Sequence, residues 1–248
     1  MNVLSLAGVV LLGIGAGLLV NYLSDVLPLT RRLSPPLCVY CNKTVPLARF
    51  VRYQHCLQCG ASRTIRSMVV QSIYPAAFLW FLFMPPVRLG FWIAAGLLIY
   101  LGVVVVIDLE HRVVLHPVSL AGAFIGLAIG WKLRGLQPTL LGGLAGFVIM
   151  LALYAAGEGF ARFLARMRKQ VIDEVALGFG DVNLSGVLGL LLGWPGITAG
   201  LFLAIVLGGL VSFGYILVAK VRRRYQMFTA IPYAPFLILG AVILLYRP

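Results

Sequence analysis

Long apolar segments follow one another through almost the whole 248-residue sequence, and they limit what the chain can fold into. A helix that crosses the hydrocarbon core of a bilayer needs about 20 apolar residues. Only 11% of the residues are charged, against about 25% in a soluble domain. The sequence therefore predicts an all-α polytopic membrane protein with about eight transmembrane helices. We expect these helices at residues 3–23, 68–86, 89–107, 114–131, 138–157, 180–193, 197–219 and 230–246.

The Lys and Arg residues gather in alternate loops between these segments. The first loop carries seven of them, the fifth and the seventh carry four each, and the sixth carries none. Because basic residues concentrate in cytoplasmic loops, this distribution places the odd-numbered loops in the cytoplasm and both ends of the chain outside. The same bias accounts for the net charge of +13. We therefore expect no nucleic-acid partner, which such a charge would suggest in a soluble chain.

The first loop, residues 24–67, contains all four cysteines of the chain, as Cys38-x-x-Cys41 and Cys56-x-x-Cys59. Two such pairs are typical of a zinc ribbon, because each pair places two thiolates on one tight turn. A disulfide is the weaker alternative, since cytoplasmic thiols stay reduced. We predict a small cytoplasmic insertion held together by zinc in place of an apolar core. His55 is more typical of a surface residue than of a fifth ligand.

Two acidic residues stand at the ends of predicted helices. Asp108 closes the segment 89–107, and Asp181 opens the segment 180–193 directly after Gly178-Phe179-Gly180. The loop assignment puts both ends on the cytoplasmic side, so the two carboxylates are expected at the same depth. An acid within a membrane segment costs free energy and is usually functional.

Two carboxylates that share one proton can cut a peptide bond, because one takes a proton from water while the other donates one to the substrate carbonyl. Glycines before Asp181 allow a substrate backbone to come close. Each acid also has a simpler explanation. Asp181 suits a helix N-cap, and Asp108 could be an interfacial acid balanced by Arg112. The predicted matched depth favours a catalytic pair.

These features together resemble the type IV prepilin peptidases, the GxGD-type membrane aspartic proteases. Gly178-Phe179-Gly180-Asp181 matches the GxGD motif of that family, and the region from Ile107 to Arg112 matches its first catalytic aspartate. The four cysteines match the cytoplasmic tetracysteine of the bacterial members. The segment from Ile231 to Phe236 is similar to a closing Pro-Phe-Gly-Pro segment.

The resemblance implies a bacterial inner-membrane endopeptidase that removes the basic leader of a type IV prepilin or pseudopilin on the cytoplasmic side. Many bacterial members also methylate the new N-terminus with S-adenosylmethionine. Asp108 and Asp181 would be catalytic, and Gly178 and Gly180 would contact the substrate. We further hypothesise that three nearby acids attract the basic leader, namely Glu110, Asp173 and Glu174.

The resemblance also suggests how the chain divides. We expect a first transmembrane helix at 1–23, which lacks the basic start of a cleaved signal peptide. A zinc-binding loop domain at 24–67 and a membrane-embedded peptidase domain at 68–248 follow.

Three local departures distinguish this chain from the family pattern. Asn183 stands where the family usually has Lys, which changes the electrostatics next to the pair. Pro117 follows Asp108 at a greater distance than is usual. The early Gly-Ser-Phe-Leu-Asn segment, in the part linked to methyl transfer, is reduced to Gly17-Leu18-Leu19-Val20-Asn21.

Two other classes of function compete with the peptidase. A proton-coupled transporter would use buried acids as a relay, but it favours acids at the midplane and inverted repeats. A non-catalytic zinc-ribbon scaffold of a secretion or pilus machine would account for the cysteines alone.

Overall fold

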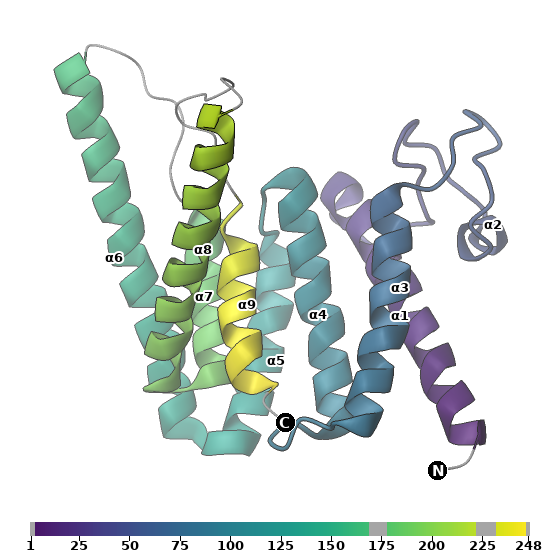
Figure 1. The fold of residues 1–248 in the computed structure, drawn as a ribbon, viewed down its shortest axis with the longest axis horizontal. Helices are drawn as coiled ribbons and strands as arrows, with labels where there is room; N and C mark the ends of the chain where they lie inside the picture. The colour runs from purple at the N-terminus through teal and green to yellow at the C-terminus, as the bar shows by residue number, and fades with distance from the viewer. Residues whose placement is uncertain (1–2, 169–177, 222–231, 247–248) are drawn as a thin grey trace. The chain divides into compact units, whose positions relative to one another are not determined.

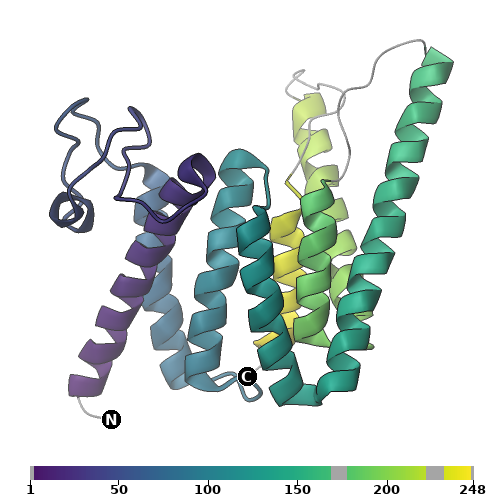
Figure 2. The same ribbon diagram turned by 180° about the vertical axis from the view of Figure 1, so that it is seen from behind.

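The computed structural model describes residues 3–168, 178–221 and 232–246, and within them the chain is helical (Figures 1 and 2). Apart from one isolated bridge between Leu37 and Thr44, the described residues hold no β-structure. The helices are α1 (Val3–Thr30), α2 (Leu47–Val51), α3 (Ile65–Phe83), α4 (Gly90–His111), α5 (His116–Arg134), α6 (Leu136–Arg168), α7 (Phe179–Leu192), α8 (Gly196–Val221) and α9 (Ala234–Leu245).

Each of the expected apolar segments coincides with one helix, and α2 is an additional short helix in the first loop. The helices α1, α3, α4, α6 and α8 are long and apolar enough to cross a membrane, whereas α7 and α9 are shorter apolar helices. The prediction of an all-α polytopic membrane protein is therefore confirmed, while the number of about eight transmembrane helices stays a prediction.

Several helices extend further than the sequence predicted, and the extensions are longest in α1 and α6. α6 continues to Arg168, through a stretch of Ala, Leu and Arg that favours helix. α1 continues to Thr30 and so includes Asp25, which the apolar pattern had left in the first loop. Arg31 then ends α1 with a left-handed φ of 54°, and its N–H donates to the Leu27 carbonyl at 2.9 Å.

The chain folds as two compact units, residues 1–107 and 108–247. In the first unit, α1 packs along α3 (Figure 2). The backbones come close at Gly13, where a Cβ would lie 2.5 Å from the Cα of Pro75. The hydroxyl of Tyr74 donates to the Leu98 carbonyl at 3.1 Å and so connects α3 to α4.

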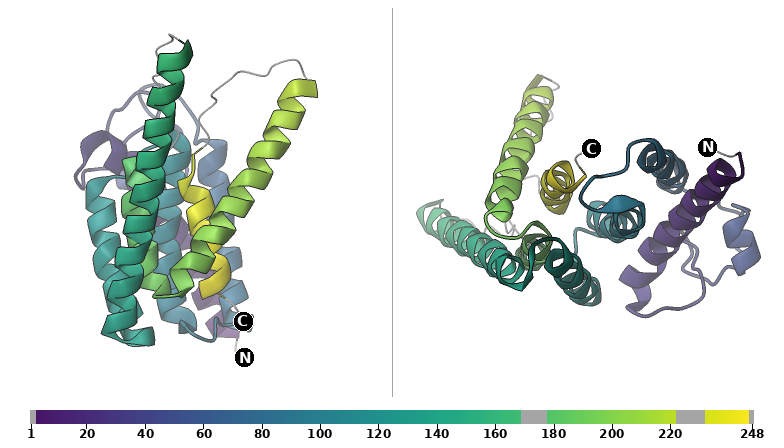
Figure 3. Two further views of the ribbon diagram at one scale, coloured as in Figure 1. Left: turned by 90° about the vertical axis from the view of Figure 1, so that its left-hand side faces the viewer. Right: turned by 90° about the horizontal axis from the view of Figure 1, so that it is seen from below.

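The second unit is built around α7, which contacts α5, α6, α8 and α9 (Figures 1 and 3). Nine of its 14 residues are buried. Glycines allow α6 to lie directly against it: a Cβ on Gly142 would overlap the Gly189 carbonyl and lie 2.5 Å from the carbonyl carbon of Gly193. This is the small-residue packing by which membrane helices associate, and here it joins α6 to the C-terminal end of α7.

Candidate active site and metal centre

Asp108 lies in the last turn of α4, and its side chain is buried, with 5% of the residue exposed. Its backbone carbonyl accepts from the N–H of Arg112, whose left-handed φ of 53° ends the helix. The carboxylate accepts a hydrogen bond from the N–H of Ala234 at the start of α9. Its Oδ2 is buried and has no hydrogen-bond partner among the described residues. Such an atom normally pairs with water or a ligand.

Asp181 lies in the first turn of α7 and is 8% exposed. Its Oδ2 accepts from the N–H of Gly178 at 3.2 Å, so the carboxylate caps its own helix. The capping explanation is thus correct in part, although the N-cap position itself is occupied by Gly178 and Asp181 stands three residues later.

Both carboxylates belong to the second unit, and three observations place them near each other. The charge of Asp108 acts on Asp181 directly. Val114, which follows α4, packs on Gly180 so closely that a Cβ there would lie 2.8 Å from the Cβ of Val114. Tyr233, next to Ala234, lies within electrostatic reach of Asp181. The start of α9 therefore borders both acids.

The remaining acids and glycines near this site are less closely placed. Glu110 is exposed near the end of α4. Gly178 donates the capping hydrogen bond, and Gly180 has a structural reason to be glycine in its contact with Val114. The predicted substrate contacts Asp173 and Glu174 lie outside the described residues.

The two cysteine pairs form the same turn twice. The N–H of Cys38 donates to Lys43 O, and its carbonyl accepts from Asn42, while Cys56 repeats this pattern with Ala61 and Gly60 at 3.0 and 2.9 Å. The residue after each second cysteine has a left-handed φ, 55° at Asn42 and 67° at Gly60. The N–H groups of Cys59 and Gln58 lower the pKa of the Cys56 thiol to about 6, which favours the thiolate that binds metal.

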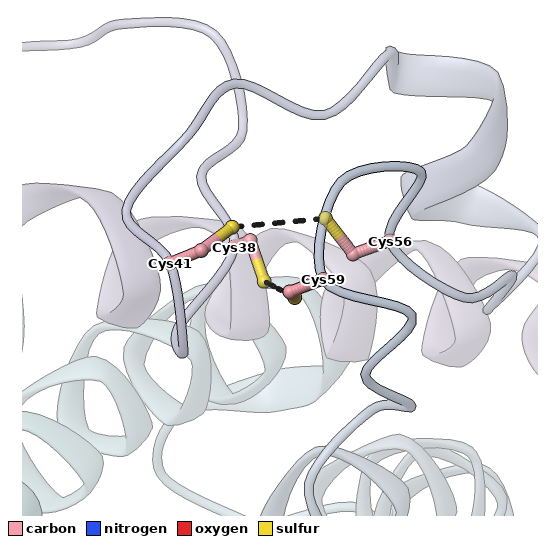
Figure 4. A group of neighbouring side chains, drawn as sticks. All are labelled: Cys38, Cys41, Cys56 and Cys59. Carbon is pink, nitrogen blue, oxygen red and sulfur yellow. Dashed lines mark hydrogen bonds between the residues drawn. The ribbon is translucent and has the colours of Figure 1, made fainter.

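The two turns face each other and bring the four sulfurs together (Figure 4). The Sγ atoms of Cys38 and Cys59 are 3.6 Å apart, those of Cys41 and Cys56 are 3.8 Å apart, and all four lie within 4.8 Å of one another. Four sulfurs at about 2.3 Å from a tetrahedral zinc would be about 3.8 Å apart. The donor set therefore fits a four-thiolate metal ion. His55 is exposed and outside this group.

A buried polar cluster next to the metal loop, the segment between α1 and α3 that holds the four cysteines, was not predicted from the sequence. The side chain of Asp25 is 0% exposed and forms ion pairs with Arg63, at 3.0 Å, and with Arg66. Arg66 also donates to Asn21, whose amide donates to the Ser67 carbonyl at 3.0 Å. The signal was present in the sequence, since Asp25 is the only acid before Asp108 and adjoins an apolar segment.

Comparison with known proteins shows a similarity to one protein family. The model of the type IV leader peptidase family matches residues 92–213, a range that contains both Asp108 and Asp181. Residues 92–213 are thus similar to the type IV leader peptidase family. The chain is also 29% identical over 188 residues to the prepilin leader peptidase/N-methyltransferase of Pectobacterium carotovorum subsp. carotovorum. No solved structure matches the chain.

The leader peptidase match begins after the metal loop, which lies wholly in the first unit. The match to the Pectobacterium protein covers 74% of this chain and 61% of that relative. The family resemblance noted in the sequence is thereby confirmed for the part of the chain that carries the two aspartates.

Proposed function

We propose that this chain is a membrane aspartic endopeptidase that cuts the basic leader from type IV prepilins or pseudopilins. The observation that carries the proposal is the pair of buried carboxylates, Asp108 in the last turn of α4 and Asp181 in the first turn of α7, within the leader peptidase match. The match to a peptidase family favours this function over a transporter or a non-catalytic scaffold.

In the proposed reaction the pair begins with one proton. The ionised carboxylate removes a proton from a water molecule, whose oxygen attacks the substrate carbonyl carbon, while the protonated carboxyl donates its proton to the carbonyl oxygen. The carboxyl that took the proton from water then gives it to the amine as the C–N bond breaks, and the other carboxylate takes back a proton from a hydroxyl of the tetrahedral intermediate. The pair returns to its starting state with one proton. The Oδ2 of Asp108, which has no hydrogen-bond partner in the described part of the chain, is the oxygen that we propose takes the proton from water.

We test the activity by producing the chain with a type IV prepilin in a bacterial host that lacks its own leader peptidase. Mass spectrometry of the substrate N-terminus should show a shortened product that begins at the cleavage site. An uncut prepilin in the presence of a well-produced, membrane-inserted chain would contradict the proposal and leave the scaffold as the better explanation.

We propose that cleavage occurs on the cytoplasmic side. The leader of the substrate is basic, and Glu110, which is exposed two residues after Asp108, is proposed to attract it. Glu110→Gln should raise KM for a basic leader by about threefold, the size of a partly screened charge interaction, with kcat unchanged. For a leader whose Lys and Arg are replaced with Gln, the wild type and Glu110→Gln should have the same KM. Equal KM values for the basic leader would remove Glu110 from substrate binding. Asp173 and Glu174 stay proposals of the same kind.

The metal of the tetracysteine loop is proposed to be zinc with a structural role. The purified chain should contain about one zinc per molecule, and Cys56→Ser should lose most of it, because a structural site needs all four ligands. Inductively coupled plasma mass spectrometry of the purified protein measures the zinc content directly. His55→Ala, next to Cys56, is the matched control and should retain its zinc. A wild-type protein without zinc, or with iron in its place, would contradict the assignment.

We also propose that the chain methylates the new N-terminus with S-adenosylmethionine, as the name of the Pectobacterium relative suggests. The same mass spectrum reports this step, because the mature substrate gains the mass of one methyl group. No residue of this chain is assigned to the cofactor.

A further inference from the structure

Arg63 belongs to two structures at once, the metal loop and the buried cluster around Asp25. It stands two residues after Ala61, whose carbonyl completes the second cysteine turn by accepting from the N–H of Cys56. Its guanidinium group reaches back to pair with Asp25 of α1 at 3.0 Å. The backbone of the second cysteine turn therefore also positions the positive charge of Arg63 beside Asp25 of α1, the helix that packs on α3.

The side of the loop that holds Arg63 is itself closely packed. The guanidinium carbon lies 3.7 Å above the ring of Phe50, and Nη2 donates to the Phe50 carbonyl at 3.3 Å. Phe50 is 3% exposed. Arg63, Phe50, Cys38 and Cys56 line one small cavity of about 30 Å³. These contacts hold the guanidinium group of Arg63 in place. Unfolding of the loop would therefore also break the ion pair between Arg63 and Asp25.

Loss of Arg63 would leave the negative charge of Asp25 without one of its two ion-pair partners among the described residues. Its side chain is fully buried, and its remaining ion-pair partner, Arg66, also donates to Asn21. Removing one partner of a buried ion pair is strongly destabilising, because the other charge stays buried and under-compensated. The amide of Asn21 and the hydroxyl of Tyr53 continue this network to Gln71, which donates to the Ile14 carbonyl at 2.9 Å. A change at Asp25 therefore affects the packing of α1 on α3.

We propose that Asp25 couples metal binding by the four cysteines to the packing of α1 on α3, through its ion pair with Arg63. The inference rests on the structural metal proposed above. It assigns Asp25 and Arg63 as positioning residues, since neither is a metal ligand. Because coupling between two sites is reciprocal, metal binding stabilises the helix pair and the intact ion pair tightens metal binding by the same factor.

The test uses the full chain in detergent and measures zinc affinity by competition with a chromophoric chelator. Asp25→Asn should weaken zinc binding by about tenfold, within the usual range of coupling between sites. Zinc should also raise the Tm of the wild-type chain more than that of the variant. Glu158→Gln removes an exposed acid that pairs with Arg162 at 2.9 Å on α6, and it should change neither measurement.

A second variant approaches the pair from the loop. Arg63→Gln should weaken zinc binding to a similar extent, and the double variant should be no weaker than either single one, because residues in one network are not additive. If both single variants lower the Tm equally with and without zinc and leave the zinc affinity unchanged, the cluster is only structural and the proposal is wrong. A wild-type chain that binds no zinc would instead contradict the metal assignment.

Discussion

Asp181→Asn is expected to abolish leader cleavage while leaving the protein folded. The amide has the shape of the carboxylate, and its oxygen can still accept from the N–H of Gly178, so the first turn of α7 keeps its cap. It cannot take a proton from water. Removing general acid–base catalysis typically costs about 10²–10⁴-fold in rate, and in a pair that shares both roles we expect the upper part of this range. Single-turnover cleavage of a purified prepilin measures the loss.

Asp108→Asn should have an effect of the same size, since its amide oxygen can still accept from the N–H of Ala234. Residues that act as one unit are not additive, so the double variant should be about as slow as either single variant. Glu158→Gln is the control for the loss of an acid at an exposed site, and it should cleave at the wild-type rate. Normal processing by either aspartate variant would exclude the proposed pair.

The second large effect is expected at the contact between α6 and α7. Gly142→Val should destabilise the chain by about 3 kcal/mol, the upper end of the cost of overpacking, because the added atoms would meet the backbone of α7 rather than a movable side chain. The displacement of α7 should also lower cleavage, since Asp181 lies in its first turn. Thermal unfolding in detergent, together with the cleavage assay, measures both effects.

Gly157→Val, on the same helix, is the matched control. No neighbouring atom lies within 4 Å of a Cβ at Gly157, and valine has a slightly higher helix propensity than glycine. This variant should be as stable as the wild type or slightly more so. Equal destabilisation by the two substitutions would mean that the cost arises within α6 and that the helix contact contributes nothing.

The helices and the metal loop could be predicted because their signals are local. Apolar segments of the length of a span identify helices without any knowledge of their neighbours, and each expected segment coincides with one helix. The two cysteine pairs likewise indicate a metal site by spacing alone, since each turn needs only its own residues. The sidedness of the loops, inferred from Lys and Arg, stays a prediction.

The placement of Asp108 beside Asp181 was inferred from matched depth, but depth does not decide which helices are neighbours. The tertiary structure supplies that information through the packing of Val114 on Gly180 and through the start of α9, which borders both acids. These contacts join segments that are far apart in the chain, and the hydrophobic pattern of the sequence does not indicate them.

The sequence by itself determined the class of protein, the helical segments, the candidate metal ligands and the two candidate catalytic acids, because hydrophobicity and ligand spacing act over a few residues. Only the tertiary structure decided that Asp25 is a buried partner of Arg63 and Arg66 and that α7 lies at the centre of the second unit. The reason is that the burial of a charge and the neighbours of a helix depend on distant segments, whose arrangement in space a local pattern does not contain.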